Sequence, residues 1–128
     1  MKTFKKTYTI NAEAEDVYAA LTNKVTIEIW SGYPAVMGDR PGEPFSLWEG
    51  DIEGVILELE KNKKIAQEWF FGGQEERSVA VIVLVRDYGR TLLSVEHTNI
   101  PDEAYKNISE GWTEYIIGAI DRFLNPNF

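Results

Sequence analysis

Apolar and polar positions alternate over several short stretches of the chain, a pattern typical of half-buried β-strands. The first stretch, Lys2–Ile10, mixes apolar residues with Lys and Thr and is predicted to be an edge strand. Residues 35–44 are rich in Gly and Pro and are predicted to form a loop. Later strands are predicted at residues 45–48, 51–60, 64–71, 78–86 and 90–98. Because short turns separate these consecutive strands, the sequence predicts an antiparallel meander.

The apolar spacing becomes helical directly after the first strand. Val17, Ala20 and Leu21 recur at three- and four-residue intervals behind an acidic first turn, which suits the positive end of a helix dipole. A helix is therefore predicted over residues 12–22, and a second, short helix over residues 24–30.

A third helix, much longer, is predicted after Pro101. Its apolar stripe comprises Tyr105, Ile108, Trp112, Tyr115, Ile116, Ala119 and Phe123. A long helix can bury such a stripe by covering the concave face of a curved antiparallel sheet. The expected fold is therefore α+β, with six to seven antiparallel strands curved around a long C-terminal helix and two short helices after the first strand. We expect residues 1–128 to form a single domain.

Composition narrows the classes of function. The chain has 128 residues, a formal net charge of -8 and no cysteine. Its negative field opposes nucleic acids and anionic lipid surfaces, and it has no apolar run long enough to span a membrane. The lack of cysteine fits a reducing cytoplasm. With a single histidine and no phosphate-binding glycine loop, we expect a cytoplasmic protein without metal, cofactor, nucleic-acid or membrane partner.

Short motifs in a characteristic order run through nearly the whole chain. The first half contains VYAALT at 17–22, WSG at 30–32, AVM at 35–37, FSL at 45–47 and GDIEG at 50–54. The second half contains KIAQEW at 64–69, TLL at 91–93, His97 before Pro101, and GW at 111–112 with Tyr115. Taken as a set, these motifs resemble the C-terminal domain of the activator of the heat-shock protein 90 ATPase.

The resemblance implies a fold and a partner. The family is related to lipid-transfer START domains and polyketide cyclases, so it implies a seven-stranded helix-grip fold around a cavity. It also implies a chaperone partner. The eukaryotic activator, however, binds the chaperone's middle segment through a separate N-terminal domain, to which no segment here corresponds. Two local departures are Pro41–Phe45, where the family has paired glycines before the Phe, and Trp69–Phe71, which replaces the family's Trp-Arg.

Two polar residues are predicted to point inward from the strands. His97 shares a strand face with Leu93 and Val95, and Gln67 lies between Ile65 and Trp69. His97 is interpreted either as a group that faces a cavity or, preferentially, as a hydrogen-bonded core residue, because no partnering nucleophile or metal-ligand spacing is evident. Gln67 either orients a ligand or ties the strand to the helix.

Large aromatic residues dominate the remaining candidate positions. They are Trp30, Phe45, Trp48, Trp69, Phe71, Trp112 and Tyr115. Individually they are expected to fill the core, because aromatic rings bury large areas. As a group they also suit the wall of an apolar pocket. Gly111 and Gly118 lie within the predicted long helix, where glycine costs about 1 kcal/mol relative to Ala, and they indicate close packing or unfilled space.

Three functions follow, in order of preference. The first is non-enzymatic binding of a small apolar or aromatic ligand between the sheet and the C-terminal helix. The second is a co-chaperone-like interaction with a heat-shock protein 90-type ATPase. The third is a cyclase or hydrolase that uses His97 as its acid-base residue, and we do not favour it. A run of carboxylates around residues 49–60 is interpreted as a solvated face.

Overall fold

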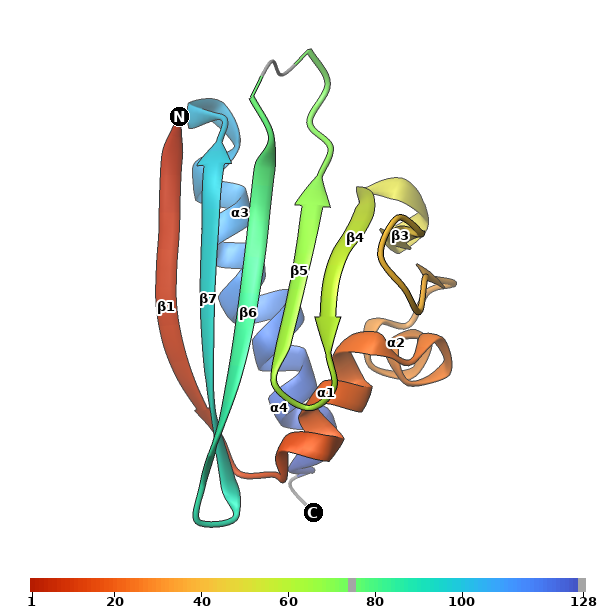
Figure 1. Cartoon of the computed structure of the whole chain (residues 1–128), viewed down its shortest axis with the longest axis vertical. Coiled ribbons are helices and arrows are strands. Elements are labelled where there is room, and N and C mark those ends of the chain that lie inside the picture. Colours follow the sequence, from red (N-terminus) through yellow and green to blue (C-terminus); the bar gives the residue numbers. More distant parts are fainter. Residues whose placement is uncertain (74–75, 127–128) are drawn as a thin grey trace.

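The computed structural model describes residues 1–73 and 76–126. Within these residues, seven antiparallel strands form one sheet in the order β1-β7-β6-β5-β4-β3-β2 (Figure 1). The strands are β1 (Lys2–Ile10), β2 (Val36–Met37), β3 (Pro44–Leu47), β4 (Ile52–Glu60), β5 (Lys64–Trp69), β6 (Ser78–Asp87) and β7 (Arg90–Ile100). The α-helices are α1 (Ala14–Thr22), α2 (Lys24–Ser31), α3 (Tyr105–Gly111) and α4 (Gly118–Leu124). Shorter helical elements are η1 (Trp48–Gly50), η2 (Asp102–Ala104) and the π-helical η3 (Trp112–Ile117).

The predicted meander and its edge strand are confirmed. Strands β3 to β7 pair consecutively, and β1 closes the sheet at one edge by pairing with β7. The β6–β7 hairpin turns at Tyr88 and Gly89, whose φ angles of 51° and 84° are those of a two-residue turn with both central residues left-handed. The loop prediction for residues 35–44 missed β2, which pairs with β3 through only two residues and is too short to show a period.

The two short helices lie where the sequence predicts them. Helix α1 begins at Ala14, two residues later than predicted, and packs against α4 and β6. Asn23 caps the N-terminus of helix α2, and its side chain accepts a hydrogen bond of 3.0 Å from the Thr26 amide. Gly32 caps the C-terminus, and its φ of 79° is the left-handed conformation that glycine favours.

The C-terminal helix is continuous from α3 to α4, but its middle is a π-helix. The Gly118 amide donates to the Thr113 carbonyl, five residues back rather than four. The extra residue in this turn changes which side chains, within the π-helix and after it, face the core. The sequence prediction is therefore wrong for Tyr115, which is 65% exposed, and for Phe123, which is 37% exposed. The buried positions after Trp112 are Ile116, Ile117 and Ile120, with Leu124 partly buried.

The geometry of the π-helical turn explains why residue 118 is a glycine. A Cβ at Gly118 would lie 2.5 Å from the Thr113 carbonyl oxygen, so the turn excludes a side chain there. The Arg122 guanidinium donates a hydrogen bond of 3.1 Å to the Glu114 carbonyl. The Thr113 hydroxyl and the Tyr8 hydroxyl are 2.9 Å apart, which links the same turn to β1. The side-chain exclusion and these two contacts together hold the π-helical geometry in place.

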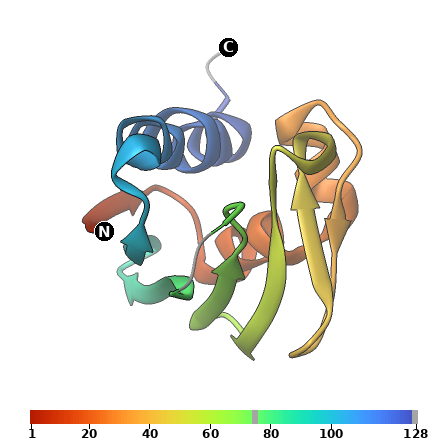
Figure 2. The ribbon, with the colours of Figure 1, turned by 90° about the horizontal axis from the view of Figure 1, so that it is seen from above.

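The sheet curves partly around the C-terminal helix, and the core lies between them (Figure 2). Strand β4 carries Gly54 where a side chain would clash with the Glu68 carbonyl and with the Phe45 ring. Because Gly54 has no side chain, the Phe45 ring can pack against β4 at this position and is buried in the core. None of the helices in residues 1–73 and 76–126 is both long and apolar enough to cross a membrane.

Candidate functional site

Three aromatic rings meet at the centre of the core, between β5, β7 and the C-terminal helix. Trp69 and Trp112 stack with their ring centroids 5.1 Å apart and their planes at 30°. The His97 ring meets Trp69 edge-on, with its centroid 4.6 Å away, and lies 6.0 Å from Trp112. Each of the three side chains is at most 4% exposed. We refer to Trp69, His97 and Trp112 as the aromatic core cluster.

Both ring nitrogens of His97 are hydrogen-bonded within the core. The Trp112 indole N–H donates to His97 Nδ1 over 3.0 Å. An indole nitrogen can only donate, so Nδ1 must accept and the proton of the neutral ring lies on Nε2. Nε2 is 2.8 Å from the Ser78 hydroxyl, which in turn donates to the Thr98 carbonyl over 2.9 Å. Burial lowers the pKa of His97 to about 4, so the ring is neutral at physiological pH.

These hydrogen bonds bear on acid-base chemistry. His97 contacts a serine hydroxyl, but His97 Nε2 already carries the proton and therefore cannot accept the proton of Ser78. The geometry agrees with the interpretation of His97 as a hydrogen-bonded core residue. Gln67 is also buried, and its side-chain oxygen accepts a hydrogen bond of 3.1 Å from the Trp69 indole N–H. Both inward-facing predictions are therefore confirmed. Both ring nitrogens of His97 and the side-chain oxygen of Gln67 have hydrogen-bond partners.

The space between the sheet and the C-terminal helix is almost completely filled. A hollow of about 20 Å³ remains, bordered by Trp30, Gln67, Trp69 and Trp112 among others. This volume is close to what a single water molecule needs. Among residues 1–73 and 76–126, this hollow is too small for an organic ligand, because the two stacked tryptophans occupy the space beside it.

A much larger hollow of about 470 Å³ lies outside the core cluster, between η1 and the C-terminal helix. One wall consists of Trp48, Asp51 and Ile52, from η1 and the start of β4. The opposite wall belongs to the C-terminal helix and consists of Asn107, Ile108, Gly111, Tyr115 and Ile116. We call this hollow the η1–helix groove.

Both walls of the η1–helix groove have unusual backbone features. Trp48 and Glu49 have φ angles of 50° and 55°, in the left-handed region that non-glycine residues rarely occupy. Such strain concentrates at functional sites. On the helix, a Cβ at Gly111 would meet no atom within 4 Å, so the missing side chain leaves open space. The groove thus has a strained turn at one wall and, at the other, a glycine whose missing side chain leaves open space.

The polar groups in the η1–helix groove are not engaged with other parts of the protein. Within the described residues, the side chains of Trp48, Asp51, Asn107 and Tyr115 make no hydrogen bond or ion pair to another protein group. The Trp48 ring meets Trp30 edge-on with centroids 6.2 Å apart, and Trp30 itself donates to the Ala20 carbonyl over 2.8 Å. Trp48 therefore has a fixed neighbour on one side and a free indole N–H.

Comparison with known proteins identifies the family. The family model described as "Activator of Hsp90 ATPase homolog 1-like protein" matches residues 11–125. The chain belongs to this family. Its seven-stranded sheet and long C-terminal helix form the helix-grip fold of START-like and polyketide cyclase-like proteins.

Individual relatives agree with this assignment. The mouse activator of 90 kDa heat shock protein ATPase homolog 1 is 27% identical over 120 residues, which is 92% of this chain but only 35% of that protein. The chain thus spans about a third of the length of this relative. An HSP90 activator from Plasmodium falciparum has a crystal structure with a TM-score of 0.89 and 25% identity, covering 97% of this chain and 96% of that one. The Aha1 dimer from Colwellia psychrerythraea shares the fold, with a TM-score of 0.85 at 16% identity over the full length of both chains.

The structure divides the nine residues that the sequence analysis predicted for a ligand site into two groups. Phe45, Gln67, Trp69, His97 and Trp112 are buried in the core, and Trp30 and Phe71 are partly buried against it. Only Trp48 and Tyr115 line the η1–helix groove. The sequence pattern did not single out Ile52 or Asn107 as site residues. It placed Ile108 and Ile116 in the apolar stripe of the helix and Asp51 in a solvated run of carboxylates. Besides Trp48 and Tyr115, the sequence signal for the groove was Gly111, which was interpreted as a mark of close packing or unfilled space in the helix.

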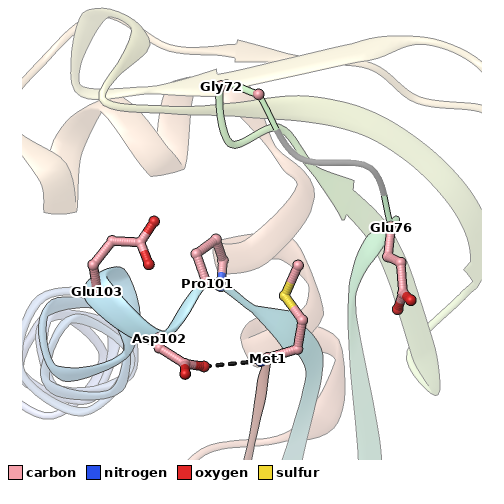
Figure 3. Close-up of a pocket in the computed structure, with 7 residues that line it drawn as sticks. Met1, Gly72, Glu76, Pro101, Asp102 and Glu103 are labelled. Carbon is pink, nitrogen blue, oxygen red and sulfur yellow. Dashed lines mark ion pairs between the residues drawn. The ribbon is translucent and has the colours of Figure 1, made fainter.

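Another hollow, of about 430 Å³, lies at one end of the sheet beside β7 and η2 (Figure 3). Its lining carries the carboxylates of Glu76, Asp102 and Glu103. It contains none of the nine residues that the sequence analysis predicted for a ligand site. The Met1 amino group lies 2.9 Å from Asp102, and this hydrogen bond lowers the pKa of Asp102 (Figure 3). No three His, Asp or Glu side chains gather as they would around a metal ion in residues 1–73 and 76–126.

Proposed function

We propose that this protein binds a small apolar or aromatic molecule in the η1–helix groove. The observation that carries the proposal is the groove itself. Its volume of about 470 Å³ falls within the roughly 300–1,000 Å³ of typical ligand sites. Its walls combine Ile52, Ile108 and Ile116 with two aromatic rings and a few polar groups, which is the usual composition of a small-molecule pocket.

The filled interior supports this location over the space beneath the helix. A ligand between the sheet and the helix would have to displace Trp69 or Trp112, and both rings are hydrogen-bonded and stacked. The η1–helix groove requires no such displacement. The strained turn at Trp48 and Glu49 costs folding free energy, on the order of 1–3 kcal/mol per residue. Strained residues of this kind cluster at functional sites, which supports a role for this turn in binding.

Gly111 provides the test, because its substitution changes the groove without touching the core. The probe is 4-phenylbutan-1-ol, which has about eleven non-hydrogen atoms; at roughly 0.4–0.5 kcal/mol per atom we expect a dissociation constant on the order of 0.1–1 mM. Binding is followed by NMR from the side-chain signals of Tyr115 and Ile52. Gly111→Leu should abolish binding by filling the groove.

Gly111→Ala is the matched control. It adds only a methyl group in open space, so it should keep the probe affinity within about twofold. It also favours the helix by about 1 kcal/mol, so the helix should stay intact. If the probe does not bind the unmodified protein, or if Gly111→Leu binds it as well as Gly111→Ala, the proposal is rejected.

A second candidate function is interaction with a heat-shock protein 90-type chaperone. The observation that favours it is the Plasmodium falciparum HSP90 activator, which matches this chain over nearly the full length of both. The test is a pull-down and an ATPase assay with the chaperone from the organism that encodes this chain. Stimulation of the ATPase that saturates with added protein supports this function, and the absence of both binding and stimulation rejects it.

A further inference from the structure

The η1–helix groove also indicates the charge of its ligand. We infer that the ligand is an organic cation: an ammonium or other protonated amine attached to an apolar or aromatic body. This inference rests on the proposed function, because it concerns the occupant of the same groove. Three features of the groove support it: the negative charges around it, its two aromatic rings and the carboxylate of Asp51, which is unpaired within the described residues.

The charges around the groove are strongly one-sided. Asp51 is the one charged residue in the lining, which contains no Lys, Arg or His among the described residues. Four further carboxylates, those of Glu49, Glu53, Glu110 and Glu114, each stand next in the chain to a lining residue, whereas Lys106 is the one cation so placed. The protein as a whole carries a net charge of -8. A cation is therefore attracted to the groove and an anion is repelled.

These carboxylates are available. Some acidic side chains elsewhere on the surface pair with a neighbouring cation, as in Glu58 with Lys64 at 3.2 Å and Glu68 with Arg77 at 3.1 Å. Within the residues that the structure describes, neither Asp51 nor any of the four flanking glutamates forms an ion pair. A bound ammonium would thus be a new partner and would not have to displace an internal one.

The aromatic rings of the groove fit the same ligand. Trp48 and Tyr115 stand on opposite walls, and the faces of both ring types attract cations through their π-electrons. The isoleucine side chains beside them accommodate an apolar body. Aromatic faces with a nearby carboxylate form the arrangement that recognises an ammonium group, whereas a carboxylate ligand would meet Asp51 as a like charge.

The test uses three probes with one apolar body and different charges: 4-phenylbutan-1-amine, 4-phenylbutan-1-ol and 4-phenylbutanoate. Affinities are measured by NMR titration at pH 7 in 20 mM and 300 mM NaCl. We expect the amine to bind best and the carboxylate worst, and the preference for the amine to shrink at the higher salt concentration, as screening requires. Asp51→Asn should weaken the binding of the amine by about two- to fivefold and leave the affinity for the alcohol unchanged.

Glu60→Gln is the matched control. It removes the same unit of charge at the other end of β4, roughly 27 Å along the strand, and should leave all three affinities unchanged. If the alcohol binds but the amine is no tighter than the alcohol or the carboxylate, the groove binds ligands and the inference is overturned. The inference is also overturned if Asp51→Asn and Glu60→Gln change the affinity for the amine equally. If none of the three probes binds, the proposed function and the inference both fall.

Discussion

The aromatic core cluster and the η1–helix groove use the same residue types in opposite ways. In the cluster, Trp69, His97 and Trp112 are almost fully buried, and each of their polar ring atoms has a hydrogen-bond partner. In the groove, Trp48 and Tyr115 are partly or largely exposed and their polar atoms have no protein partner within the described residues. The cluster therefore serves stability, and the groove is free to serve recognition.

The π-helical turn connects the two regions. Because it adds one residue between Trp112 and Gly118, the helix continues to cover the core with Ile116, Ile117 and Ile120 while Tyr115 turns outward. A regular α-helix would have placed the Tyr115 ring toward the core. The difference between the two regions thus rests partly on a local backbone irregularity, a feature frequent at functional sites.

The largest expected effect separates the two regions by stability. Trp112→Ala should lower the free energy of unfolding by about 3–5 kcal/mol, because it leaves a large cavity in a packed core. Tyr115→Ala, three residues away on the same helix, should change it by less than about 1 kcal/mol because its side chain is mostly exposed. Urea denaturation of both variants measures the comparison. Similar losses in the two variants would contradict the division into core and groove.

The next effect concerns pH and tests the cluster through its histidine. The folded-state pKa of about 4 lies below the usual 6.5, so the unfolded chain binds the proton more readily. Stability from this group is therefore complete above pH 6.5 and is lost as the pH falls toward 4, by about 3 kcal/mol in total.

His97 is the only histidine in the chain, which makes the pH measurement selective. Between pH 7 and pH 5, the unmodified protein should lose about 2 kcal/mol more stability than His97→Gln does over the same interval. Urea unfolding at the two pH values gives this difference. Equal losses would mean that the histidine is not buried in its neutral form.

The smallest effect concerns the strained turn of the groove. Glu49→Gly should raise the free energy of unfolding by about 0.5–1 kcal/mol, because glycine adopts the left-handed φ of 55° without steric cost. Asp51→Gly in the same turn should lower it by a similar amount, on the order of 0.5–1 kcal/mol, because Asp51 has an ordinary φ of -58°. Opposite signs in urea denaturation support stored strain, and equal signs contradict it.

The sequence predicted the parts of the molecule that depend on regular periods. Alternation along β5 and β7 identified Gln67 and His97 as inward-facing, and the order of strands and helices followed from short turns. The π-helical turn escaped prediction because nothing in a 3.6-residue period signals an extra residue, and the positions of Tyr115 and Phe123 were wrong as a result. The η1–helix groove escaped because its walls, around Trp48 and Gly111, lie far apart in the chain.

The most direct test of the central claim is to locate the bound probe. Intermolecular nuclear Overhauser effects from 4-phenylbutan-1-amine to the protein's methyl groups distinguish the two regions, since Ile52 and Ile108 border only the groove and Leu21 and Ile82 only the inner hollow. We predict contacts to Ile52 and Ile108 with none to Leu21 and Ile82. Contacts to Leu21 and Ile82 would contradict the account, because they would place the ligand beneath the helix among the core rings.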